Sequence, residues 1–361
     1  MLTAQSTPSR MPVTESATVV PHPVAVPITI SFKWLLALYA ILPVCFLAGL
    51  IDKYYFNSKL QPLLPLAPEN YFWLALLFGT PHILASNIIL LSNREYFVKY
   101  RQRLALVTLL IIAFFGIGYF VLSYNVLFAL VATTTVIHVV KQQIGIGNSL
   151  ARLSGPVFQC WAWSVIGTGV VLYNAIFLND QFTDRQHDLL YALMLGLSAL
   201  TIFLACICFR RIKTPLAKAF FVGNSALSIV SVVLYREKYY FFAVLGPRVI
   251  HDVTAFIFYV AHDYNRHHTQ PRNGLYKVFN KLNVSAFLAV PLMAVGATYL
   301  LQVYGNPLFD AVTLRLFNVR IPNAITLGFI GYLSLLHYYT EAFTWKGDSP
   351  YKRYIAFKRP G

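Results

Sequence analysis

Hydrophobic residues gather in ten long runs, and apolar and polar positions do not alternate within them. The runs cover residues 33–51, 71–92, 104–123, 125–147, 156–178, 188–209, 217–235, 239–263, 283–304 and 322–345. A helix needs about 20 mainly apolar residues to cross the hydrocarbon core of a bilayer. Because lipid offers backbone amides no partners, only helices and closed barrels cross it, and the lack of alternation favours helices. The pattern therefore predicts an all-α, polytopic membrane bundle with about ten transmembrane helices.

The composition excludes a soluble globule. Hydrophobic residues make up 57% of the chain and charged residues 12%, whereas soluble domains are about one quarter charged. Outside the runs, residues 1–30 are rich in Ser, Thr, Pro and Val and lack the pattern of a cleaved signal peptide. We therefore predict a disordered N-terminal tail over 1–30, a single transmembrane helical domain over 31–346 and a basic cytoplasmic tail over 347–361.

The excess of basic residues indicates the orientation of the chain. A net charge of +16 would favour nucleic-acid binding in a soluble protein. Here the Lys and Arg residues lie mostly in the segments that follow the even-numbered runs, which predicts that those segments face the cytoplasm. Both termini are then cytoplasmic in a multi-pass protein of the cell (inner) membrane. We expect the lipid bilayer and an apolar small-molecule substrate as partners, and no nucleic acid.

The positions of the histidines indicate a site inside the bundle. Counted from the flanking polar residues, His82, His138 and His251 lie near the middle of the bilayer, and His337 lies somewhat nearer the cytoplasm. Polar side chains in lipid are costly and usually face the bundle interior. Four imidazoles at similar depth on four helices predict a shared metal or cofactor site. The alternative is that each histidine makes an ordinary structural hydrogen bond.

A second group of histidines lies at the cytoplasmic end of the eighth run, where His262 and His267 stand near Asp263. His251 and His262 are eleven residues apart, which is about 16 Å along a helix, so they cannot bind one ion. The site is therefore either the mid-membrane group or this cytoplasmic group, joined by histidines of other helices. An interfacial stretch beside anionic lipid is the structural alternative for the second group.

Four polar residues lie beside these histidines in sequence or one helical turn away, where they are expected to orient the imidazoles: Gln142, Asp252, Asp263 and Glu341. Histidine and carboxylate ligands without thiolate suit non-haem iron, zinc or copper better than calcium. Fe(II) is the expected ion, with zinc or haem as alternatives.

Two short segments carry a further pattern. They are Gly79-Thr80-Pro81-His82, and Phe256-Ile257-Phe258-Tyr259 followed by His262-Asp263 and Arg266-His267. This pattern distantly resembles the bacterial Brp/Blh family of membrane β-carotene dioxygenases. The resemblance implies a helical membrane enzyme with histidine-bound non-haem iron that splits β-carotene to retinal, with His82, His262 and His267 as iron ligands. The chain departs from the family in having Arg266 four residues after His262 and no histidine in its first run.

Three functions remain open from the sequence. The first is a His-ligated, non-haem iron oxygenase that acts on a lipid-soluble substrate such as a carotenoid or an acyl chain. The second is a membrane electron-transfer protein in which pairs of histidines bind haem axially. The third is a transporter in which histidine, Asp252 and Glu341 form a proton path. Metal analysis and an optical spectrum distinguish the three.

Overall fold

The chain folds as a bundle of helices with almost no sheet. The computed structural model describes residues 27–358 apart from 66–72, 74, 322–323 and 345–348. Within these residues, nine helices are long and apolar enough to cross a membrane: Phe32–Tyr55, Ala75–Ser92, Arg94–Gly118, Asn125–Ala151, Pro156–Phe177, Asp184–Phe209, Pro215–Arg236, Tyr240–His267 and Ala286–Phe317. The predicted tenth run begins outside the described residues, and its described part is also helical. The all-α class is thus confirmed, and the length and composition of these helices fit a multi-pass membrane protein.

The helical elements follow the apolar runs closely. The α-helices are α1 Phe32–Ala37, α2 Ile41–Tyr55, α4 Thr80–Ser92, α5 Arg94–Val121, α6 Tyr124–Ala151, α7 Pro156–Phe177, α8 Asp184–Phe209, α9 Pro215–Arg236, α10 Tyr240–His267, α11 Gly274–Lys281, α12 Ala286–Tyr299, α13 Asn306–Phe317 and α14 Ile330–Thr344. Short 3₁₀ turns are η1 Leu38–Ala40, η2 Gln61–Leu63, η5 Asn179–Gln181 and η8 Pro350–Tyr354. Three π-helical turns, η4 Ala75–Gly79, η6 Leu300–Gly305 and η7 Ala324–Phe329, precede α4, α13 and α14.

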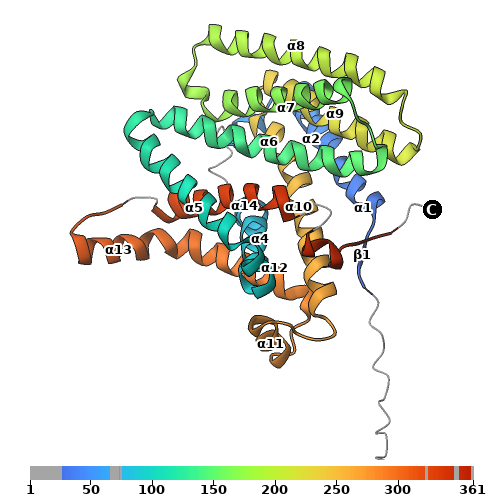
Figure 1. Ribbon diagram of the computed structural model, residues 1–361. Coiled ribbons are helices and arrows are strands. Elements are labelled where there is room, and N and C mark those ends of the chain that lie inside the picture. The colour runs from blue at the N-terminus through green and yellow to red at the C-terminus, as the bar shows by residue number, and fades with distance from the viewer. Residues whose placement is uncertain (1–26, 66–72, 74, 322–323, 345–348, 359–361) are drawn as a thin grey trace, which may run out of the picture.

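Helix α10 joins two groups of helices. In Figure 1, α6, α7, α8 and α9 lie together in the upper part of the bundle, and α4, α5, α12 and α14 lie below them. Helix α10 runs between the groups and contacts α6 and α9 on one side and α4 and α12 on the other. A residue near the middle of α10 therefore lies where the two groups meet.

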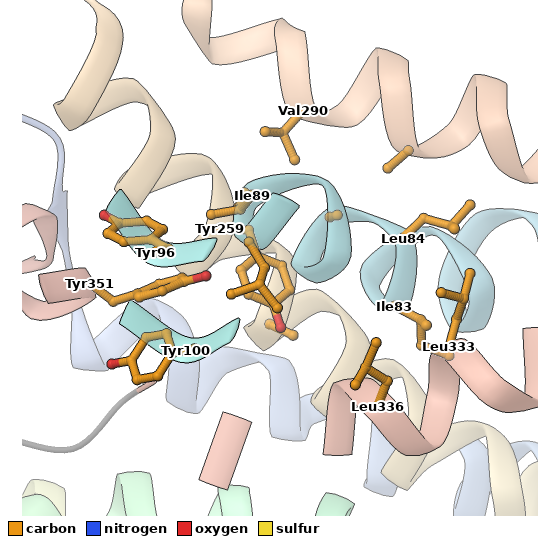
Figure 2. Close-up of a cluster of buried hydrophobic side chains, with 14 of the residues drawn as sticks. Ile83, Leu84, Ile89, Tyr96, Tyr100, Tyr259, Val290, Leu333, Leu336 and Tyr351 are labelled. Carbon is orange, nitrogen blue, oxygen red and sulfur yellow. The ribbon is translucent and has the colours of Figure 1, made fainter. Parts of the chain in front are cut away.

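The lower group packs around a large buried cluster. Figure 2 shows Ile83, Leu84, Leu333 and Leu336 at one part of this cluster, contributed by α4 and α14. Tyrosines gather elsewhere in it, and the rings of Tyr96 and Tyr351 stack with centroids 4.1 Å apart. Burial of these side chains fixes α4, α5 and α14 against α10, which positions the polar residues on the same helices.

The two ends of the described chain meet on α10. Strand β1 (Thr29–Ile30) pairs in parallel with β2 (Ala356–Phe357). The Asn265 amide of α10 donates to the carbonyls of Ile28 and Tyr354, both at 2.9 Å, and its Oδ1 accepts from the Ile28 N–H at 2.7 Å. The predicted disordered tail over 1–30 lies almost entirely outside the described residues. The cytoplasmic location of both termini stays a prediction.

Candidate metal centre

Four histidines from four helices meet in the interior of the bundle, and we call them the histidine quartet: His82 of α4, His138 of α6, His251 of α10 and His337 of α14. His82 and His138 each lie with their ring centroids 5.0 Å from those of both His251 and His337. Three members are almost completely buried, with exposed fractions of 3% for His82, 1% for His251 and 0% for His337. The four histidines that were expected at similar depths in the bilayer therefore lie together in the structure.

The local sequence explains how the start of α4 positions His82 beside the other three histidines. Pro81 has no backbone N–H, so the helix cannot continue its hydrogen bonds regularly through this position. The π-helical turn Ala75–Gly79 stands directly before it. Such turns occur frequently at functional sites because they reorient the following side chains. His82 is then held by the Phe78 carbonyl, 3.3 Å from its Nδ1.

The spacing of the rings fits coordination of a single metal ion. Metal–nitrogen bonds of about 2.1 Å put ring centroids about 3.2 Å from the ion, hence about 4.5 Å apart in a square and about 5.2 Å apart in a tetrahedron. The four observed separations of 5.0 Å fall between these values. The ligand nitrogens of His82, His251 and His337 all lie within 4.8 Å of one another. A small contraction would bring them to bonding distance.

Most nitrogens of the quartet have no hydrogen-bond partner among the described residues. Both nitrogens of His251 and His337 are buried and unpartnered, and so are Nε2 of His82 and Nε2 of His138. A buried polar atom without a partner costs about 1–3 kcal/mol, so native proteins rarely gather several of them. Six such atoms on four neighbouring rings indicate a place built for a ligand of imidazole, and a metal ion is the usual one.

Asp252 borders the quartet on α10. Its Oδ1 lies 3.1 Å from Nδ1 of His82 and 4.0 Å from Nε2 of the neighbouring His251. Its Oδ2 lies 3.5 Å from Nε of Arg248, one turn earlier on the same helix. The sequence placed Asp252 beside His251, whereas its shorter contact is to His82. A carboxylate that accepts from Nδ1 of His82 would leave Nε2 of that ring as the ligand atom.

Glu341 borders the quartet on α14. Its Oε2 lies 3.3 Å from Nε2 of His138 and accepts a hydrogen bond from the Gln142 amide at 2.9 Å. Its Oε1 accepts a hydrogen bond from the Tyr259 hydroxyl of α10. Glu341 also lies close enough to His138 and His337 for the three to share an ion. This carboxylate could therefore act as a further ligand or orient His138, and Gln142 and Tyr259 hold it in place.

The second group of histidines lies further along α10, and among its ring nitrogens only Nε2 of His267 is buried without a hydrogen-bond partner among the described residues. His262 has its Nε2 2.8 Å from the Tyr96 hydroxyl and its Nδ1 3.0 Å from Oδ1 of Asp263. The two nitrogens of its ring are therefore both engaged. Because His251 and His262 are eleven residues apart on one continuous helix, they stand roughly 16 Å apart. The geometry favours the quartet over this group as the metal centre.

His267 packs in the same second group. Its ring stacks on Tyr276 of α11 with centroids 3.9 Å apart, and its Nδ1 accepts the backbone N–H of Arg272 at 3.2 Å. Tyr276 donates a hydrogen bond to Asp263. Burial and the neighbouring Asp263 carboxylate raise the pKa of Tyr276, so the phenol stays neutral and keeps donating. These contacts tie α11 to the end of α10, which is a structural role.

Two residues beside the quartet were not singled out from the sequence. Arg248 stands inside the eighth apolar run, four residues before Asp252, and a charge within such a run is the signal that marks it. Tyr259 lies eight residues after His251 on α10, which is about two helical turns. Its hydroxyl donates a hydrogen bond to Glu341. Tyr259 stands at the end of the segment Phe256-Ile257-Phe258-Tyr259, which carries the family resemblance, but no role beside the quartet was expected for it.

The chain matches no family model, no curated protein and no solved structure at a significant level.

Proposed function

We propose that this chain is a membrane-embedded metalloenzyme in which the histidine quartet holds one non-haem iron ion, and that it oxidises a lipid-soluble substrate. The observation that carries the proposal is the meeting of His82, His138, His251 and His337, six of whose ring nitrogens make no hydrogen bond to a described residue. Neutral imidazoles with carboxylates nearby form a donor set that iron and zinc both accept.

The surroundings of the quartet favour oxidation over hydrolysis. A cavity of about 240 Å³ adjoins His82 and His251, and its walls are mainly apolar side chains of α6, α7, α9 and α10. An apolar cavity suits the hydrocarbon part of a substrate that partitions into lipid, and that part offers C–H and C=C bonds for oxidation. Bound iron with an open coordination position would supply activation of dioxygen there.

The residues around the quartet would prepare this chemistry. Tyr259 and Gln142 fix the Glu341 carboxylate, which in turn orients the ring of His138. Asp252 does the same for His82. Fixed partners of this kind select the tautomer of each imidazole and so the nitrogen that faces the ion.

Haem fits the quartet less well than a single ion does. Two axial imidazoles must lie on opposite faces of the macrocycle, which occupies the whole plane between them. In the quartet each ring has two others at 5.0 Å, so a macrocycle between any two rings would overlap the remaining pair. The spacing therefore supports non-haem iron over the electron-transfer alternative.

Metal analysis of the purified protein, combined with an optical spectrum, tests the proposal. We expect about one iron per chain after expression with added iron, and no Soret band. Protein loaded in this way should consume dioxygen when an apolar lipid extract is added, and chelated protein should not. A Soret band would favour the haem alternative, and a well-folded protein that binds no metal would favour the proton-path alternative.

A further inference from the structure

The wall of the cavity beside the quartet combines apolar side chains, several Ser, Thr and Tyr hydroxyls and one arginine. Valine and leucine side chains form much of its wall, including Val136, Val140, Val165 and Leu172. Arg248 lines the same cavity together with His251 and Asp252. These last three residues are spaced by three and four positions along α10 and therefore share one helix face. The cavity thus combines an apolar volume with a charged patch next to the histidines.

Most N–H donors of the Arg248 guanidinium are available to a ligand. Its Nε lies 3.5 Å from Oδ2 of Asp252, and the described residues offer its two terminal NH₂ groups no other hydrogen bond or ion pair. The side chain keeps 29% of its surface exposed. A guanidinium carries five N–H donors in a planar fork, so one long contact to a carboxylate leaves most of them available.

Gly79 makes room for this guanidinium. A Cβ added at Gly79 would overlap Nη2 of Arg248, because the terminal groups of the arginine lie directly over the glycine backbone. The close approach keeps the fork at the cavity wall, one turn of helix from the quartet. Charged groups inside an apolar span are costly and usually serve binding or transport.

From this geometry we infer that the cavity binds an apolar chain ending in a carboxylate, as in a fatty acid, and that Arg248 recognises the carboxylate. The guanidinium fork matches a carboxylate with two parallel hydrogen bonds, and exclusion of water strengthens such a pair. The cavity of about 240 Å³ is far larger than a single water needs, so it accommodates the carboxylate end of such a chain together with its first carbons.

The inference rests on the proposed function for what happens to the bound chain, because it identifies the substrate class of that same site. Arg248 and His251 are three residues apart on α10, about 5 Å along the helix. A carboxylate held by Arg248 would therefore place the first carbons of the chain nearest the histidine quartet.

Equilibrium dialysis of radiolabelled decanoate and 1-decanol tests this inference, with protein-free micelles as the blank and metal content measured on the same samples. We expect the wild-type protein to bind decanoate about tenfold or more tightly than decanol, since the pair to Arg248 is charge-assisted. In Arg248→Gln the two affinities should become equal. The matched control is Arg236→Gln, which removes an exposed arginine paired with Asp188 and should keep the preference.

A second variant covers the case in which Arg248→Gln fails to fold. Gly79→Ala keeps the arginine but displaces its fork, and it should lower the preference for decanoate severalfold. Equal binding of both ligands by wild-type protein, or an unchanged preference in either variant, would overturn the inference. A preference for decanoate in protein that binds no metal would leave the carboxylate site standing and refute the proposed metalloenzyme instead.

Discussion

Replacing His337 by leucine separates a metal ligand from a structural histidine. His337 has an exposed fraction of 0%, and neither of its ring nitrogens has a partner among the described residues. Leucine has a similar volume and no polar atoms, so His337→Leu removes both unpartnered nitrogens without opening a large void. The effect on the free energy of unfolding should therefore depend on whether the metal is present.

The magnitude follows from the number of unpartnered atoms. Each buried polar atom without a partner costs about 1–3 kcal/mol, and replacing it with an apolar group of the same shape is neutral or stabilising. Because His337 has two such atoms, His337→Leu in chelated protein should change the free energy of unfolding by between zero and a gain of about 6 kcal/mol. In iron-loaded protein the variant should lose the metal, because even an outer-shell change typically weakens binding about 10- to 100-fold.

The assay compares iron content and thermal unfolding in detergent, with and without chelator, for wild type, His337→Leu and a control. His187→Leu is the matched control, because its Nδ1 lies 2.8 Å from the Tyr235 hydroxyl and its Nε2 lies 3.2 Å from the Asn179 carbonyl. The control should lose about 1 kcal/mol of stability and no iron. Destabilisation of chelated His337→Leu by more than the control, with unchanged iron content, would refute a ligand role.

Three further outcomes are expected. Glu341→Gln should weaken metal binding about 10- to 100-fold in a metal titration, because the amide orients His138 less well than the carboxylate does; unchanged affinity would contradict this. His262→Leu should leave the iron content unchanged. It should destabilise the protein by about 2–4 kcal/mol in thermal unfolding, because Tyr96 and Asp263 each lose a hydrogen-bond partner. Loss of iron in this variant would instead indicate that the second group of histidines is the metal site. Asn265→Ala should speed limited proteolysis of both terminal segments while the membrane core stays resistant, and equal cleavage would show that the amide does not hold them.

The fold was predictable because spanning a membrane sets strict demands on length and polarity. Apolar runs long enough to cross lipid are visible without any knowledge of packing, and the helices begin and end near them. The ninth run shows the limit of this reasoning. It was expected over 283–304, whereas the structure continues through η6 and α13 to Phe317. Asp310 and Arg315 end the apolar pattern, yet they do not end the helix.

The sequence was enough to predict how deep each histidine lies in the bilayer, but not which way its side chain points. Counting residues along each span places His82, His138, His251 and His337 at a similar level, since the rise per residue is fixed. The rotation of each helix depends on packing between helices, which one sequence does not reveal. For that reason the choice between the quartet and the group around His262 needed the structure.

The partners of the quartet were predictable only along a single helix. Spacing by four residues places Glu341 on the face of His337, but its contact to His138 crosses from α14 to α6. Asp252 likewise reaches His82 on α4. Arg248 could have been identified from the sequence, because it is a charged residue inside an apolar run. The role of Tyr259 becomes visible only from the packing of α10 against α14, which brings its hydroxyl to Glu341.

X-ray absorption at the iron edge tests the central claim most directly. In iron-loaded protein we predict a first shell of nitrogen and oxygen at about 2.1 Å, with the multiple-scattering signature of about four imidazoles. His82, His138, His251 and His337 would account for that number. A shell with one imidazole or none, or one that contains sulfur, would contradict the assignment of the quartet as the metal centre.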